Sequence, residues 1–230
     1  MVFAVGGVLI TAAAIAFWMP WFGLVDLREV VVRGNHHAAA ADLVSLTNLQ
    51  RGQSLFSLPF SRICSDVLQH PWVKSVSLER SLPHTLIIRV EERREVAWMA
   101  DPSGGGVFTI GEGGVIVSAE SSAPEAEVEL RGVHLSHDAV GGVVLDGPVT
   151  DLVVALREGA LSGIGVQRID VVDSYSVELE TVSGVRILLG TIDEALSRLP
   201  SLAAINRSLD VEDYEVIDLR YGGEATLAPR

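Results

Sequence analysis

The stretch HPWVKSVSLERSLPHTLIIRVEER, residues 70–93, contains two runs of alternating apolar and polar residues joined by a short turn. Alternation with a period of two is typical of half-buried β-strands. The apolar residues of each run share one face, and they are Val76 and Leu78 in the first run and Leu86, Ile88 and Val90 in the second. Because Pro83 fixes the backbone between the runs, the stretch predicts an antiparallel hairpin.

One further strand and two helices are predicted upstream of this hairpin. Residues 27–34 (LREVVVRG) alternate as a strand that ends at Gly34-Asn35. Residues 39–49 and 59–70 carry apolar residues at helical spacing, and Pro71 ends the second helix. Two helices that cover one face of a three-stranded sheet bury both apolar stripes. Residues 26–93 are therefore predicted to form an α+β domain of the order β-α-α-β-β.

Residues 94–221 predict a second, mixed α/β domain with a mainly antiparallel sheet. Runs typical of strands lie at 96–98, 107–110, 115–117, 130–133, 166–172, 176–181, 185–189 and 215–221. A helix is predicted over 148–161, and a second begins at Thr191, where Glu194 three residues on completes a capping-box pattern. Pro200 is expected to kink or end that helix. Residues 222–230 are expected to be a flexible tail.

Residues 1–25 contain no charged side chain, and Trp18, Trp21 and Phe22 lie near their end. About 20 apolar residues span a bilayer as a helix, and aromatic rings favour its interfaces, so a single transmembrane anchor is predicted. A cleaved signal peptide is the alternative, but it requires a basic first region and a cleavage site that the stretch lacks. No Lys or Arg precedes the stretch, so charge gives no orientation.

Composition excludes several classes of function. The chain carries 30 acidic and 17 basic side chains, a net charge of -13, which opposes binding to nucleic acid. Zinc needs three or four convergent ligands, and the pairs His36-His37 and His134-x-x-His137 have no suitably spaced partners. The single cysteine, Cys64, lies among apolar residues at helical spacing, which favours a packing role. We expect no catalytic site, cofactor, metal or small-molecule substrate.

Several motifs together resemble the FtsQ/DivIB cell-division family. SLFSL at 54–58 and the pattern PWV-x-S-x-x-x-x-R-x-x-P-x-T-L-x-I-x-V-x-E-R at 71–93 resemble its POTRA domain. VIDLRY at 216–221 is similar to its terminal strand. The POTRA signature residues are Gly34, Asn35, Pro71, Trp72, Val73, Arg80, Pro83, Glu92 and Arg93. Most of these suit turns and helix ends, so they identify a scaffold rather than an activity.

The resemblance implies a non-enzymatic divisome scaffold at the septum that helps localise and control peptidoglycan synthesis. It implies a single-pass protein of the cytoplasmic membrane, with both domains on the outer side, that binds the coiled-coil membrane proteins FtsB and FtsL. The terminal strand, as an open sheet edge, would receive a partner strand. The residues implied are Ile217, Leu219, Arg220 and Tyr221. The same residues are equally compatible with completing the core of the last strand.

Two other interpretations compete with the division scaffold. POTRA domains also serve as exported chaperones or transport adaptors in outer-membrane assembly systems. Such proteins carry a long C-terminal barrel, whereas residues 222–230 follow Tyr221 here. A secreted enzyme with an uncleaved signal is the second alternative, and it would need a convergent set of titratable groups that the sequence does not indicate.

Overall fold

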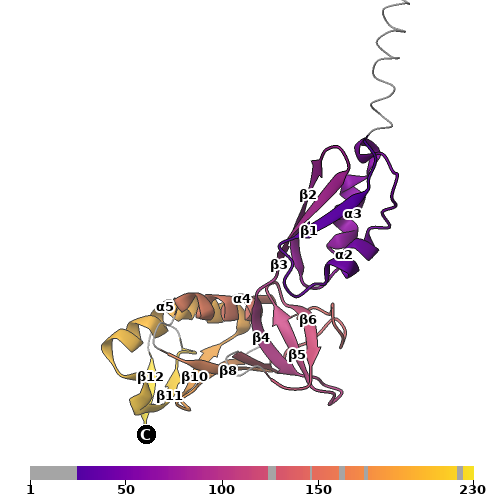
Figure 1. Ribbon diagram of the computed structural model, residues 1–230. Helices are drawn as coiled ribbons and strands as arrows, with labels where there is room; N and C mark the ends of the chain where they lie inside the picture. The colour runs from indigo at the N-terminus through magenta and orange to yellow at the C-terminus, as the bar shows by residue number, and fades with distance from the viewer. Residues whose placement is uncertain (1–24, 124–127, 146, 161–163, 174–175, 222–224) are drawn as a thin grey trace, which may run out of the picture. The chain divides into compact units, whose positions relative to one another are not determined.

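A computed structural model of the protein describes residues 25–123, 128–145, 147–160, 164–173, 176–221 and 225–230. The chain divides between Arg93 and Arg94 into two compact units, each described by itself below (Figure 1). The anchor predicted for residues 1–25 falls outside the described residues except for Val25. No helix within the described ranges combines the length and apolar character that a membrane span requires.

The first unit is a three-stranded sheet with two helices. In chain order its elements are β1 (Glu29–Arg33), α2 (Ala40–Leu46), the 3-10 helix η1 (Leu55–Ser57), α3 (Phe60–Val67), β2 (Val73–Ser81) and β3 (Thr85–Glu92). The strand order is β1-β3-β2, with β1 parallel to β3 and β2 antiparallel to it. The β-α-α-β-β order and the hairpin at 70–93 are thereby confirmed.

The two helices of the first unit are shorter than the sequence pattern predicts. α2 ends early because Asn48 adopts a left-handed backbone (φ 52°), a conformation that stops a helix. α3 ends at Val67, four residues before Pro71. Both helices still bury their apolar stripes. The fully buried residues of this core include Leu27, Leu43, Leu55, Ile63, Val67, Leu86 and Ile88.

The second unit is a nine-stranded mixed sheet, counted over the described residues. Its elements are β4 (Glu95–Ala100), β5 (Val107–Gly111), β6 (Val115–Glu120), β7 (Val128–Arg131), α4 (Gly147–Ala155), the π-helix η2 (Leu156–Ala160), β8 (Val166–Asp173), β9 (Ser176–Thr181), β10 (Arg186–Gly190), α5 (Ile192–Ser208), the 3-10 helix η3 (Val211–Asp213), β11 (Tyr214–Asp218) and β12 (Thr226–Pro229). The strand order is β12-β11-β10-β9-β8-β7-β4-β5-β6. Among these strands β4·β7, β7·β8 and β10·β11 pair in parallel, and the other pairs are antiparallel.

α4 and α5 lie on the same side of this sheet (Figure 1). Contrary to the sequence prediction, α5 does not end at Pro200 but continues to Ser208. Proline removes one backbone hydrogen bond, but Leu199 and Leu202 on either side of it are buried in the core, and this packing holds the helix together. Thr191 is the N-cap as predicted, although its hydroxyl bonds the Glu194 carboxylate (3.0 Å) rather than a backbone N–H.

The expected flexible tail is wrong in one part. Residues Thr226–Pro229 form β12, which pairs antiparallel with β11. The motif VIDLRY, which was expected at the open border of the sheet, therefore has a neighbouring strand on each side. These neighbours of β11 are β10 and β12. Among the described residues the border is β12 instead.

Candidate partner-binding edge

The two ends of the nine-stranded sheet differ in how far the chain covers them. Along the start of β6, residues 141–144 supply backbone bonds: Ile116 N–H donates to Gly142 O, and Gly141 N–H donates to Ile116 O, both at 2.8 Å. Val144 N–H donates to Gly114 O at 2.8 Å. At the opposite end, the described residues place no strand beyond β12. A β-sheet edge of this kind is a template for another strand.

The register of β12 fixes which of its backbone groups face outward. Arg230 N–H donates to Asp213 O (3.2 Å), so Tyr214 and Pro229 form a pair without mutual hydrogen bonds. Alternation along the strand then points the backbone groups of Thr226 and Ala228 toward β11. The backbone groups of Leu227 and Pro229 point away from β11. Since proline has no N–H, Leu227 carries the outward-facing amide of β12.

The structure separates the four partner-binding residues that the sequence analysis grouped together. Ile217 is 0% exposed, pairs with Ile187 and Leu227 on its two sides, and belongs to the core, as does buried Leu219. Arg220 and Tyr221 lie just beyond β11, and the Tyr221 side chain is 72% exposed. Arg220 is held by the Asp218 carboxylate (2.7 Å), and its guanidinium carbon lies 5.6 Å from the Tyr221 ring centroid.

The POTRA signature residues meet mainly at the end of the first unit where β3 finishes. The Trp72 ring stacks on the His37 ring, with centroids 4.1 Å apart at an interplanar angle of 9°. Arg93 donates from its backbone N–H to Trp72 O (2.8 Å) and from Nε to Pro71 O (3.1 Å). The Asn35 amide donates to Ala38 O (3.0 Å). Buried Val73 pairs with Glu92.

Family models match both units of the chain. The model of the FtsQ-type POTRA domain covers residues 25–93, and that of the FtsQ/DivIB C-terminal domain covers residues 103–220. The chain belongs to the FtsQ/DivIB cell-division family. Members of this family are non-enzymatic division proteins associated with the membrane at the division site.

Individual FtsQ and DivIB proteins are similar along most of the chain. The cell division protein DivIB of Clostridium acetobutylicum is 23% identical over 184 residues, covering 79% of this chain and 72% of the relative. FtsQ of Corynebacterium glutamicum is 21% identical over 200 residues, covering 86% and 87%. FtsQ of Myxococcus fulvus is 27% identical over 210 residues, covering 86% and 69%.

In this FtsQ/DivIB chain a row of paired charges crosses the sheet face opposite α4 and α5. Arg168 donates to Glu129 (2.8 Å) on one side and to Glu180 (2.5 Å) on the other, and Arg131 also bonds Glu129 (2.7 Å). Burial raises the pKa of the Glu129 carboxyl, but the two arginine bonds outweigh it and hold that pKa below its ordinary value. The paired side chains satisfy one another's charges, which suits a structural ladder.

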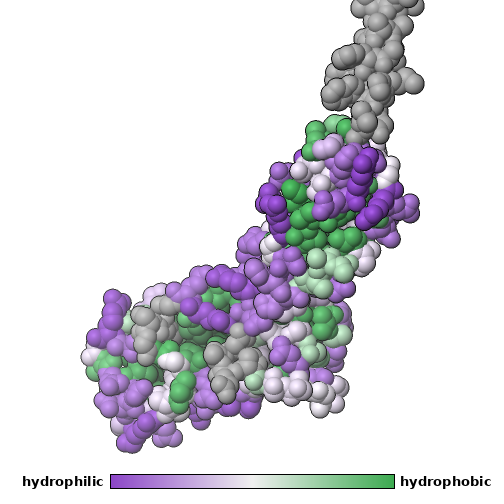
Figure 2. Space-filling view, viewed as in Figure 1, coloured by the Kyte–Doolittle hydropathy of each residue, from purple (hydrophilic) through white to green (hydrophobic). Residues whose placement is uncertain are grey.

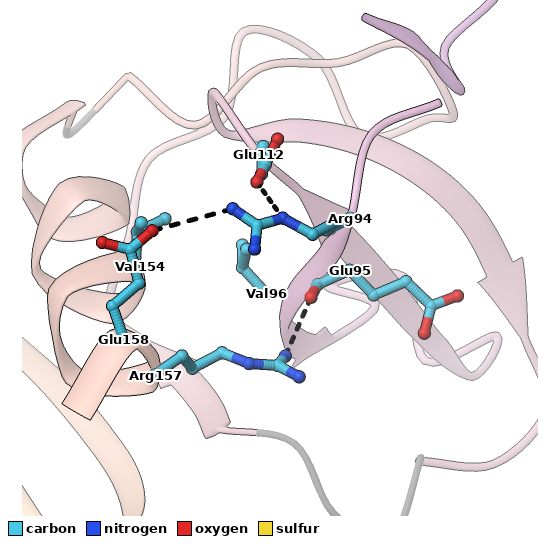
Figure 3. A pocket seen from close by; sticks show the side chains of 7 residues that line it. All are labelled: Arg94, Glu95, Val96, Glu112, Val154, Arg157 and Glu158. Carbon is cyan, nitrogen blue, oxygen red and sulfur yellow. Dashed lines mark hydrogen bonds and ion pairs between the residues drawn. The ribbon is translucent and has the colours of Figure 1, made fainter. Parts of the chain in front are cut away.

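A hollow of about 260 Å³ opens beside the start of β4 (Figure 3). Arg94 pairs with Glu112 and lies 3.7 Å from the Glu158 carboxylate, and Arg157 donates to Glu95 O at 2.8 Å. The Glu112 bond raises the pKa of Arg94, which is charged in any case. These contacts tie β4 to η2, so the hollow has a structural explanation. Across the described ranges, no three potential metal-binding side chains gather at one point.

Glu92 organises the loop that leads from β1 into α2. Its carboxylate accepts backbone N–H bonds from His36, His37 and Ala38, each at 2.9 Å. Burial alone would raise the pKa of this carboxyl, but the three N–H donors and the His37 ring outweigh it and lower the pKa to about 2. The folded first unit therefore favours the ionised form of Glu92.

We expect Glu92→Gln to lower the free energy of unfolding by about 2 kcal/mol at pH 7, because the amide lacks the charge that four donors share. Since folding lowers this pKa from 4.5 to about 2, the contribution is complete above pH 4.5 and is lost as pH falls through about 2. Urea unfolding of both proteins between pH 7 and pH 2 measures the difference between their free energies of unfolding. This difference should shrink as pH falls from 4.5 to about 2. A gap that stays constant with pH would contradict the assignment.

Leu227 and β12 were not found from the sequence, although a signal was present. Gly222-Gly223 separates VIDLRY from the short run TLAP at 226–229, and a glycine pair between two apolar runs is a hairpin signal. The proline at 229 concealed it, because proline within a run argues against a strand. An edge strand tolerates proline where its nitrogen faces outward, as it does here.

Proposed function

We propose that this chain acts in cell division as a non-enzymatic scaffold that captures FtsB- and FtsL-like coiled-coil membrane proteins by strand addition. The binding edge is β12 (Thr226–Pro229), and the captured proteins are thereby held where septal peptidoglycan is made. The single observation that carries this proposal is the sheet order, in which β12 has β11 on one side and no described strand on the other.

Family membership supports the division context, and the geometry of the sheet edge supports the proposed binding mode. Strand addition draws affinity from main-chain hydrogen bonds and specificity from side chains. β12 offers few outward groups: the Leu227 N–H and C=O and the Pro229 C=O. So short an edge needs an additional side-chain contact, and exposed Tyr221 next to Arg220 provides one, since Tyr and Arg often dominate binding interfaces.

The proposed location is the cytoplasmic membrane at the septum. Residues 1–25 would anchor the chain as a single membrane span, with residues 26–93 and 94–230 on the outer side. The family is associated with the division-site membrane, and the uncharged stretch of residues 1–25 is long enough to cross it.

Tyr221→Asp should reduce the FtsB-like partner recovered with the full-length protein by about 30-fold, because loss of a central aromatic contact costs about 2 kcal/mol. Tyr221→Phe is the matched control, because it keeps the ring and should retain most binding. Co-purification from detergent-solubilised membranes measures both. Tyr221 is exposed, so both variants should unfold at the wild-type temperature. Wild-type recovery with Tyr221→Asp would remove Tyr221 from the interface.

A further inference from the structure

Three segments of the first unit converge at the end where the described chain begins. Leu55 N–H donates to Val25 O at 3.1 Å, which places η1 directly beside the first described residue. The β2–β3 turn lies beside the same segment, because Arg28 N–H donates to His84 O (2.9 Å) and the His84 ring contacts the Asp26 carboxylate (2.7 Å). We call these residues, 25–28, 51–57 and 80–84, the proximal end.

The proximal end exposes large apolar side chains. Phe56 in η1 is 54% exposed and Leu82 in the β2–β3 turn is 58% exposed. Apolar surface is visible at this end of the first unit in Figure 2. Exposing two such side chains at one end of the unit costs free energy in water, and it indicates a surface that contacts something apolar.

Charge distinguishes the proximal end from the rest of the protein. Its three segments carry Arg28, Arg51 and Arg80 against the single acid Asp26. Residues 26–93 hold eight basic and seven acidic side chains, whereas residues 94–230 hold nine basic and 23 acidic ones. A surface of anionic lipid attracts the arginines of the proximal end and repels the strongly acidic residues 94–230.

We infer that the proximal end rests on the bilayer, with Phe56 and Leu82 inserted at the boundary between lipid headgroups and acyl chains. The inference depends on the proposed anchor in residues 1–25 but not on partner binding. Trp21, expected at the interface, precedes Val25 by four residues, and even a fully extended chain of that length reaches only about 14 Å. Phe56 follows the residue that bonds Val25, so the membrane lies within its reach and is the occupant that fits.

Docking restricts how the first unit moves on its anchor. An apolar tip flanked by arginines holds the unit at one inclination, because basic side chains bind anionic headgroups while apolar ones enter the acyl boundary. A unit tethered by a chain alone would instead sample many inclinations. The two arrangements differ in which surface residues meet lipid.

A site-specific dye in full-length protein tests the inference. In a Cys64→Ser background, Leu82→Cys carries an environment-sensitive dye, and the protein is reconstituted into vesicles containing anionic phospholipid and a nitroxide-labelled lipid. Leu68→Cys is the matched control, because Leu68 is a leucine of the same unit, 45% exposed, just past the end of α3. We expect at least threefold stronger quenching at residue 82 than at residue 68. Adding Phe56→Asp should at least halve the quenching at residue 82.

Four outcomes overturn the inference. Equal quenching at the two sites means that the unit is not docked by this end. Quenching at residue 82 that Phe56→Asp leaves unchanged reflects proximity to the anchor rather than insertion. A dye shift that grows with protein density, without lipid quenching, means that a second copy of the chain covers the tip. Release of the protein by alkaline carbonate refutes the anchor itself, and the partner proposal is judged separately by co-purification.

Discussion

Leu227→Pro should reduce recovery of the FtsB-like partner from membranes at least 100-fold. The substitution removes the outward N–H of β12 and places a ring where the added strand would lie. A partner carbonyl buried at the interface without a donor costs 1–3 kcal/mol, and the steric conflict adds to it, so about 3 kcal/mol is the expected loss. Backbone bonds from β12 to β11 remain, because Leu227 turns its groups away from β11.

Leu227→Ala is the matched control for this substitution. It removes the same partly buried side chain but keeps the amide, so recovery should fall only a few-fold. Co-purification of the two full-length variants, with their unfolding temperatures, separates lost binding from lost folding. Equal recovery of partner with both variants, at equal stability, would mean that the β12 backbone takes no part in binding.

The second large effect is expected at Gly34, at the end of β1. Gly34→Ala should lower the free energy of unfolding of the first unit by 3 kcal/mol or more. A Cβ atom there would lie 2.2 Å from Val90 O, a rigid backbone atom of β3, and the φ of +84° already disfavours a side chain. Relief requires β1 and β3 to separate, which breaks the parallel pairing of the sheet.

Gly52→Ala provides a close control for Gly34→Ala. Gly52 has a φ of +87°, but no atom lies within 4 Å of the position that its Cβ would occupy. Its substitution should therefore cost about 1 kcal/mol, the conformational part alone. The single cysteine of the chain, Cys64, lies half-buried in α3 of the same unit, so its alkylation in increasing urea reports unfolding of that unit. Equal losses for the two variants would show that the approach to Val90 carries no cost.

The first unit was predictable because its decisive interactions are close in sequence. The hairpin at 70–93 needs one turn and a period of two, and both are visible in the residues themselves. The helix boundaries were less predictable, since the end of α2 depends on the backbone of a single residue, Asn48. What Glu92 does could not be foreseen either, because its three donors lie more than 50 residues earlier in the chain.

In the second unit the strands were found more readily than their neighbours. Parallel pairing of β11 with β10 and antiparallel pairing with β12 both depend on which residues fold back. The motif VIDLRY indicates a strand, but it does not say whether that strand is the border. The motif could therefore place Ile217 and Leu219 in either the core or an interface, and burial decides for the core.

Hydrogen exchange at the Leu227 amide tests strand addition most directly. The full-length protein in lipid nanodiscs is compared with and without the FtsB-like partner, and deuterium is located to single residues by fragmentation. Strand addition at β12 predicts at least tenfold slower exchange at Leu227 in the complex, because its outward N–H gains a backbone acceptor. Unchanged exchange at Leu227 in a fully formed complex would contradict the proposal.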